Sequence, residues 1–203
     1  MDKKKEFVAL LKKVEKKYGK SEKRLAAEGW KEAWQILIAT IMSAQSRDET
    51  TIPIAEKLFD KYKNLESLAK AKQEDVLIIF KSLNYNKTKS KNVIMAAKFL
   101  MENFKGKVSD DIEDLVKIAG VGRKTANLIL SEVHGVESIT VDTHVHRICN
   151  VFGFVKTKNA NETELELRKI VPRKYWSRIN RLFVLWGKEV YGRDRNKFME
   201  KLN

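Results

Sequence analysis

The chain has 203 residues, which suits one domain or two small ones and allows a sizeable hydrophobic core. Its 41 Lys and Arg residues outnumber 27 Asp and Glu residues, and the formal net charge of +14 favours a polyanionic partner, most simply nucleic acid. A single cysteine excludes an intramolecular disulfide and a multi-cysteine metal site. The apolar run at 36–42 is too short to span a bilayer, which takes about 20 residues, and the start of the chain lacks the apolar segment of a secretory signal, so we expect a cytoplasmic protein.

Two helices are predicted in the first quarter of the chain. At 6–18, one face is apolar at helical spacing and consists of Phe7, Leu10, Leu11, Val14 and Tyr18. Lysines occupy the other faces; they could touch DNA, but a solvated surface is the more frequent reason for such a pattern. From 30 to 44 apolar residues surround the helix axis, which predicts a buried central helix that ends at Gln45.

Further helices are predicted after Gln45. Ser46 or Asp48 is positioned to cap the next helix, with Pro53 in or near its first turn. A short helical pair at 67–81 then leads into a polar loop, and Lys89 after that loop is a candidate for neutralising a phosphate.

Residues 110–133 predict two helices joined by a tight turn. Each helix has an apolar face: Ile112, Leu115, Val116 and Ala119 in the first, and Ala126, Ile129, Leu130 and Val133 in the second. Asp110 and Glu113 offer a capping box at the start. In the turn Gly120-Val121-Gly122, two glycines allow a sharp bend and expose backbone N–H groups at the positive end of the second helix, which suits a phosphate. An ordinary helix hairpin with a glycine C-cap is the alternative.

Asp142 precedes Thr143 and is a natural N-cap for the helix that follows. The nearby pattern His144-x-His146-x-x-Cys149 does not predict a zinc site, because residues two apart on a helix diverge by about 200° and no fourth ligand is apparent. Cys149 instead falls on an apolar stripe and is predicted to be a buried core thiol. Two more helices are predicted at 162–170 and 176–190.

Three separated stretches, in the same order, resemble the endonuclease III family of helix-hairpin-helix DNA glycosylases: Leu37 to Asp48, Gly120 to Asn127 and Val141 to Val145. The resemblance covers nearly the whole chain. It implies that Lys124 is the catalytic nucleophile and that Asp142 is its carboxylate partner. The residues expected at the DNA are Gln45, Tyr85, Lys89, Gly120, Val121, Gly122, Arg123, Thr125 and His144.

Two of these residues are expected beside the opened duplex. The resemblance implies that Gln45 fills the hole left by an extruded nucleotide, where an amide can both donate to and accept from the orphaned base. A polar residue at a helix end is the alternative. The family places a glycine-containing wedge loop at 83–89, whereas this chain has Asn84 at the usual glycine and Tyr85 near the usual apolar tip. Asn tolerates a left-handed backbone, and Tyr85 is able to stack on a base.

Most family members end with four cysteines that hold an iron–sulfur cluster. The first three matching positions here are Tyr191, Phe198 and Lys201, and the chain stops before the fourth. We therefore expect no cluster and no other cofactor or metal. The basic residues at 193–197 are interpreted either as a remaining phosphate contact or as a frayed basic tail.

The helical patterns predict an all-α protein, and the resemblance adds two helical bundles flanking a DNA-binding cleft. One bundle is expected at 27–136, with the helix-hairpin-helix at about 110–133; the other combines 1–26 with 137–203 and carries Asp142. The expected partner is double-stranded DNA that contains damaged bases or abasic sites, bound by a monomer without any membrane. The protein would be cytoplasmic and associated with the nucleoid through this binding.

The implied activity is that of a bifunctional DNA glycosylase and abasic-site lyase of base excision repair. It would remove damaged, chiefly oxidised, pyrimidines through a lysine Schiff base and β-elimination. The attacking lysine must be neutral, and the helix N-terminus, Arg123 and partial burial would each disfavour its charged form. The alternatives are a sibling glycosylase for mismatched thymine or oxidised purine, and a non-catalytic hairpin module, which would not require Lys124, Asp142 and Gln45 at their matching positions.

Overall fold

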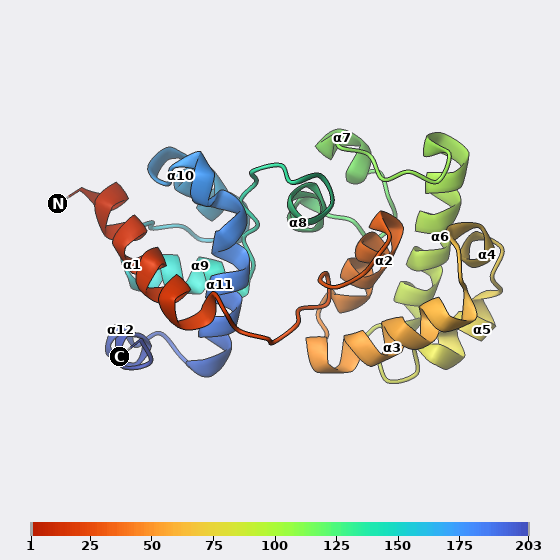
Figure 1. Cartoon of the computed structure of the whole chain (residues 1–203), viewed down its shortest axis with the longest axis horizontal. Coiled ribbons are helices and arrows are strands. Elements are labelled where there is room, and N and C mark those ends of the chain that lie inside the picture. Colours follow the sequence, from red (N-terminus) through yellow and green to blue (C-terminus); the bar gives the residue numbers. More distant parts are fainter. Residues whose placement is uncertain (1, 203) are drawn as a thin grey trace. The chain divides into compact units, whose positions relative to one another are not determined.

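The computed structural model describes residues 2–202, and within them the chain is all-α, with no strand (Figure 1). The predicted fold class is therefore confirmed. Backbone contacts divide the chain into two compact units, Met1–Lys23 with Val136–Asn203 (unit 1) and Arg24–Gly135 (unit 2). None of the described helices is long and apolar enough to cross a membrane.

Unit 2 is built around α2, which packs against α3, α6 and α8. Its helices are α2 (Ala33–Ser43), α3 (Asp48–Lys61), α4 (Leu65–Ala69), α5 (Gln73–Ile79), α6 (Asn86–Phe104), α7 (Ile112–Leu115) and α8 (Arg123–His134). As predicted, α2 is buried nearly all round, and seven of its residues from Trp34 to Met42 lie in the core. The helix therefore carries the polar loop that follows it, which includes Gln45, on a rigid base.

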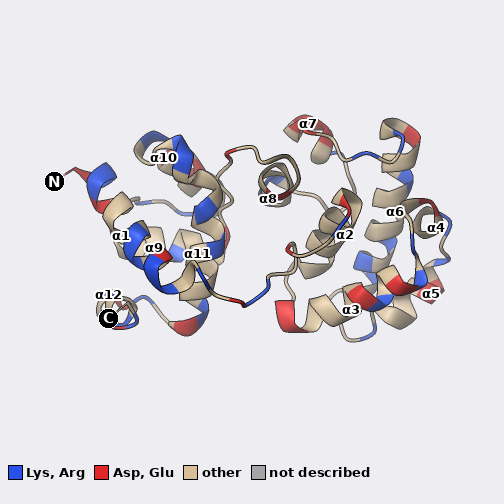
Figure 2. Ribbon diagram, viewed as in Figure 1, with Lys and Arg blue, Asp and Glu red and all other residues tan. Residues whose placement is uncertain are grey.

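Unit 1 is built around α11, which packs against α1 and α9. Its helices are α1 (Lys3–Tyr18), α9 (Thr143–Val151), α10 (Ala160–Ile170), the 3₁₀ turn η1 (Arg173–Tyr175), α11 (Trp176–Glu189) and α12 (Arg195–Glu200). All five predicted apolar residues of α1 are buried, and Phe7 lies 5.0 Å from Phe154 between ring centroids. Lys and Arg residues occur on helices of both units, so charge alone singles out no helix as the DNA contact (Figure 2).

The terminal helix α12 is anchored by an aromatic residue. Phe198 is fully buried, its ring centroid lies 5.0 Å from that of Trp186, and its carbonyl oxygen accepts a hydrogen bond from Trp186 Nε1 at 3.1 Å. Asp194 caps the helix by accepting from Asn196 N at 2.8 Å. Residues 195–200 are thus a packed helix rather than a frayed tail, and Phe198 forms an apolar anchor where the family pattern places a cysteine.

The first hairpin helix differs from the prediction. Its N-cap is Asp111, which accepts from Glu113 N at 2.8 Å, rather than Asp110. The chain leaves α-helical geometry after Leu115 and continues with i to i+3 bonds such as Ile118 N to Leu115 O. Because residues three apart eclipse each other in such turns, Ile118 joins Leu115 in the core, while Val116 is 39% exposed.

The start of α3 also differs from the prediction, since neither Ser46 nor Asp48 is its N-cap. The N-cap residue is Arg47, with no side-chain cap, because the other two side chains are engaged elsewhere. Ser46 Oγ accepts from Lys89 Nζ, and Asp48 Oδ1 accepts from Ala26 N at 2.9 Å. Pro53 lies inside the helix, beyond its first turn.

Candidate nucleic-acid interface and active site

The turn between α7 and α8 requires glycine at its first position. Gly120 has φ +84, a left-handed value that side chains rarely adopt. A Cβ there would also lie 2.9 Å from Asn92 Nδ2 and 3.0 Å from Ile41 Cγ2. The fold of unit 2 therefore accounts for this glycine without any ligand.

The second glycine of the turn is different. Gly122 is the N-cap of α8 with φ −96, which any residue adopts, and a Cβ there would meet nothing within 4 Å. The residue offers no side chain to cap the first N–H groups of α8, which lie at the positive end of the helix dipole. Protein packing does not explain this glycine, whereas close approach of a phosphate to the backbone would.

Lys124 is the second residue of α8 and its side chain is exposed, as is that of Arg123. The partial burial expected for Lys124 is not found. The reason is its place in the first turn of α8, on the side opposite the buried Ala126 and Ile129. Its amine is thus accessible to an approaching ligand, and Val121, which precedes Gly122, is buried beneath the turn.

Asp142 is the N-cap of α9, as predicted, and its Oδ1 accepts from Val145 N at 2.9 Å. The carboxylate is half-buried, and within residues 2–202 no hydrogen-bond donor occupies Oδ2. One oxygen therefore holds the helix start, while the other is available for chemistry.

His144 packs closely on α11. A Cβ at Gly187 would lie 2.5 Å from His144 Nδ1, so glycine is required for the ring to sit there. Burial lowers the pKa of His144, and the neighbouring Arg147 acts in the same direction. Arg147 donates to Gly187 O at 2.7 Å, which ties α9 to α11. No local pattern in the sequence indicates this role of Gly187.

No metal site accompanies these histidines. Within residues 2–202 there is no cluster of three His, Cys, Asp or Glu side chains suited to a metal ion. His146 Nδ1 instead contacts Thr163 Oγ1 at 2.7 Å. Cys149 is fully buried, and burial raises the pKa of its thiol, so it is the core cysteine that the sequence predicts.

Unit 2 brings Gln45 and Tyr85 to neighbouring loops, and Lys89 lies close by in the first turns of α6. Asn84 Nδ2 donates to Gln45 O at 2.8 Å, and Lys89 Nζ donates to Ser46 Oγ at 2.7 Å. The left-handed residue of the second loop is Tyr85, with φ 55, rather than Asn84. Lys89 is only 4% exposed, because it lies on the inner face of α6, so it is not the solvent-facing lysine that the charge pattern indicates.

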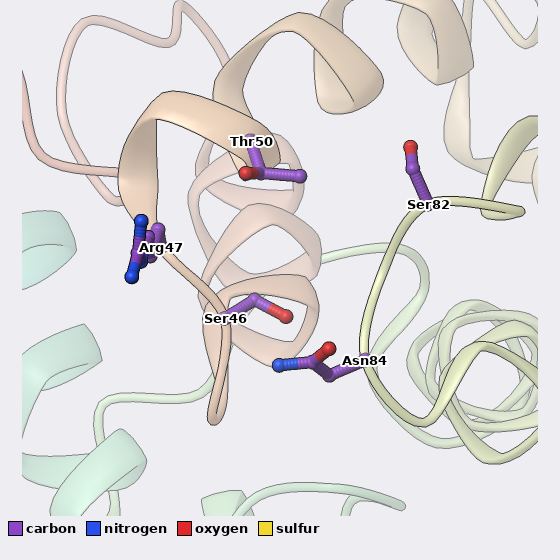
Figure 3. A pocket seen from close by; sticks show the side chains of 5 residues that line it. All are labelled: Ser46, Arg47, Thr50, Ser82 and Asn84. Carbon is purple, nitrogen blue, oxygen red and sulfur yellow. The ribbon is translucent and has the colours of Figure 1, made fainter.

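A polar pocket of about 250 Å³ opens beside these two loops. It is lined by Ser46, Arg47, Thr50, Ser82 and Asn84 (Figure 3). In this view the side chains of Ser46 and Asn84 point toward each other across the space between the loops.

These features define an all-α protein with a helix-hairpin-helix whose second helix starts at a glycine N-cap without a side-chain cap and presents an exposed lysine. The model of the HhH-GPD superfamily of base excision DNA repair proteins matches residues 38–173. Endonuclease III of Thermotoga maritima is 40% identical over 157 residues, covering 77% of this chain and 74% of that protein. Endonuclease III of Escherichia coli is 32% identical over 155 residues, covering 76% and 74%. The chain therefore belongs to the endonuclease III family of HhH-GPD base excision DNA repair proteins.

Solved structures agree with this assignment. A trapped endonuclease III–DNA covalent intermediate superposes with a TM-score of 0.84 at 29% identity, covering 91% of this chain and 86% of that one. A thermostable thymine-DNA glycosylase superposes with a TM-score of 0.83 at 18% identity, covering 99% of this chain and 93% of that one. At this identity it shows the shared fold only. The protein is accordingly a DNA glycosylase and abasic-site lyase of base excision repair, and its single cysteine makes it a member without the cluster cysteines.

Proposed function

We propose that the protein removes damaged, chiefly oxidised, pyrimidines from duplex DNA, with Lys124 as nucleophile and Asp142 as its carboxylate partner. The observation that carries the proposal is the exposed lysine directly after the glycine turn, at the start of α8. A non-catalytic hairpin module would need the turn but not this lysine. A related endonuclease III has been captured as a covalent intermediate with DNA, which supports covalent chemistry in this chain as well.

The proposed reaction begins when the neutral amine of Lys124 attacks the sugar carbon that bears the damaged base. The C–N bond to the base breaks, and the base leaves with the bonding electrons and gains a proton. The remaining sugar–amine adduct opens to a Schiff base, loses a proton from the adjacent carbon and eliminates the 3′ strand end. Asp142, through its free Oδ2, accepts a proton or stabilises positive charge on the sugar. Bound DNA would cover the exposed amine and exclude water from it.

The proposed DNA contacts follow from the same turn. The backbone of the turn at 120–123 would bind a phosphate at the positive end of α8, with the side chains of Arg123 and Thr125 beside it. The N–H of Val121 itself donates to Ile118 O at 3.0 Å, so Val121 would contribute through its place in the turn. His144 would contribute from the start of α9. We further propose that units 1 and 2 are the two domains expected from the sequence, and that the protein acts in the cytoplasm on nucleoid DNA.

The two glycines of the turn give a test of phosphate binding. We expect Gly122→Ala to change the free energy of unfolding by less than about 1 kcal/mol, because the position has open space and an ordinary φ. The same variant should bind DNA more weakly, since the added methyl group blocks the backbone from the phosphate. Thermal denaturation and fluorescence anisotropy with labelled duplex measure the two effects.

Gly120→Ala is the matched variant. It should destabilise the protein by about 1–3 kcal/mol, because its backbone is left-handed and its Cβ would meet Asn92. Unchanged DNA binding by Gly122→Ala would contradict the phosphate assignment for this turn.

A nicking assay over a panel of duplexes tests the proposed substrate class. The panel contains thymine glycol, 8-oxoguanine, a G·T mismatch and a preformed abasic site. We expect cleavage at thymine glycol and at the abasic site. Preference for 8-oxoguanine or the mismatch would favour a sibling glycosylase, and lesion binding without cleavage would favour the hairpin module.

A further inference from the structure

Two side chains tie the loop between α2 and α3 to the loop before α6. Asn84 reaches from the second loop to the main chain of the first, where its Nδ2 donates to Gln45 O at 2.8 Å. Lys89, in the first turns of α6, donates from Nζ to Ser46 Oγ at 2.7 Å. We call these two bonds the loop clamp. Figure 3 shows Ser46 and Asn84 facing each other at this place.

The clamp lies next to two residues with left-handed backbone angles, Gln45 and Tyr85. Gln45 has φ 53 and Tyr85 has φ 55, and both side chains are exposed. The third non-glycine residue with positive φ among residues 2–202 is Lys105, the C-cap of α6, where a left-handed residue is ordinary. Gln45 follows Ala44, the C-cap of α2, in a turn closed by the bond from Ser46 N to Ser43 O at 2.9 Å, whereas Tyr85 is the N-cap of α6. Left-handed positions of this kind favour glycine, so a glutamine and a tyrosine persist there only where their surroundings hold them.

The burial of Lys89 costs the folded state free energy. It is 4% exposed, and within residues 2–202 the only polar partner of its Nζ is the Ser46 hydroxyl, with no carboxylate to balance the charge. Burial lowers the pKa of Lys89 to about 8, so at pH 7 the buried amine is mostly charged. An apolar side chain of similar length would fill the same place at less cost. Packing alone therefore does not account for a lysine here.

We infer that Asn84 and Lys89 are positioning residues that hold Gln45 and Tyr85 ready to enter the duplex before DNA binds. The inference rests on the proposed roles of Gln45 and Tyr85 in nucleotide extrusion. When both residues are already ordered in the free protein, their conformational entropy is not lost at the moment the lesion is opened. The opening step then costs less free energy. Where the family pattern has glycine, this chain has Asn84, and only a side chain can make the bond to Gln45 O.

The clamp should affect extrusion of the nucleotide but not the covalent steps. Two substrates that differ in how much extrusion they need therefore test it. A lesion paired in the stack must be opened, whereas a preformed abasic site has less pairing and stacking to break. In Lys89→Met, Ser46→Ala and Asn84→Ala, the single-turnover rate on thymine glycol paired with adenine should fall about 10- to 100-fold. The rate on the abasic site should fall by less than about threefold.

Two measurements distinguish a positioning role from a loss of structure. They are the melting temperature of each variant and the fluorescence of a 2-aminopurine base in the bound DNA. Lys89→Met should melt at or above the wild-type temperature at pH 7, because it removes a buried charge and Met fills the same space. A 2-aminopurine placed beside the lesion should brighten when wild-type protein binds, and less so with each variant. Lys98→Met is the matched control, since it removes a lysine from the same helix at an exposed position and should leave both rates unchanged.

Each outcome is decisive. Equal losses on both substrates, or unchanged rates in all three variants, would overturn the clamp. If Lys89→Met melts well below wild type, Asn84→Ala and Ser46→Ala still test the clamp, because Asn84 is exposed and Ser46 is half-buried. Wild-type protein that acts on neither substrate would instead defeat the proposed function, which keeps the two failures distinct.

Discussion

Lys124→Gln should abolish strand cleavage and the protein–DNA adducts that borohydride traps, with a loss of at least about 10³-fold. Glutamine has no nucleophilic amine, so neither the attack on the sugar nor the Schiff base can form. Binding to duplex with an abasic site should persist, because the backbone N–H groups at the start of α8 remain. Gel analysis of nicked and borohydride-trapped products measures the chemistry, and anisotropy measures binding.

Lys117→Gln is the control for this substitution. Lys117 lies in the same hairpin, and its ion pair with Asp114 at 2.9 Å is on the surface, so its loss should leave the melting temperature nearly unchanged and cleavage intact. Adducts formed by Lys124→Gln at the wild-type rate would remove Lys124 from its proposed role.

Asp142→Asn should slow turnover by about 10²–10⁴-fold while the protein melts at nearly the wild-type temperature. The asparagine Oδ1 is still able to accept from Val145 N, so the start of α9 stays capped. The amide, however, neither accepts a proton nor stabilises positive charge as a carboxylate does. Single-turnover kinetics and thermal denaturation separate the two effects.

Two further variants separate the capping role of Asp142 from its role in the chemistry. Asp142→Ala removes the cap as well and should lower the free energy of unfolding by about 1 kcal/mol. Asp111→Asn makes the same chemical change at the N-cap of α7, where Asp111 accepts from Glu113 N, and should alter neither stability nor turnover. Full activity in Asp142→Asn would reduce Asp142 to a structural cap.

Local patterns in the sequence were enough to predict the helices and the N-cap role of Asp142. The apolar stripe of α1, the burial of α2 and the capping of α9 by Asp142 all depend on residues within about two turns of one another. The helix-hairpin-helix was also predicted, although α7 is shorter than its apolar spacing indicates, because 3₁₀ turns follow Leu115. Such turns depend on how the hairpin packs, which local spacing does not report.

The loop clamp was missed for a different reason. Lys89 and Ser46 are separated by 43 residues, and Asn84 and Gln45 by 39, so no local spacing links them. One signal was present, however. Lys89 lies at helical spacing from the buried Val93, Ala96 and Leu100, which places it on the inner face of α6 despite its charge. A lysine in register with a buried stripe is therefore worth treating as a core residue.

Because α12 is anchored by Phe198, the conditions that loosen the end of unit 1 differ from those that loosen a loop held by an iron–sulfur cluster. A loop held by thiolates on iron loosens in acid, in chelators and under oxidants, because its ligands must stay deprotonated and reduced. Phe198, buried against Trp186, depends instead on the removal of apolar surface from water. That contribution weakens as the temperature falls. The contact through which Phe198 attaches α12 therefore responds to temperature rather than to acid, chelators or oxidants.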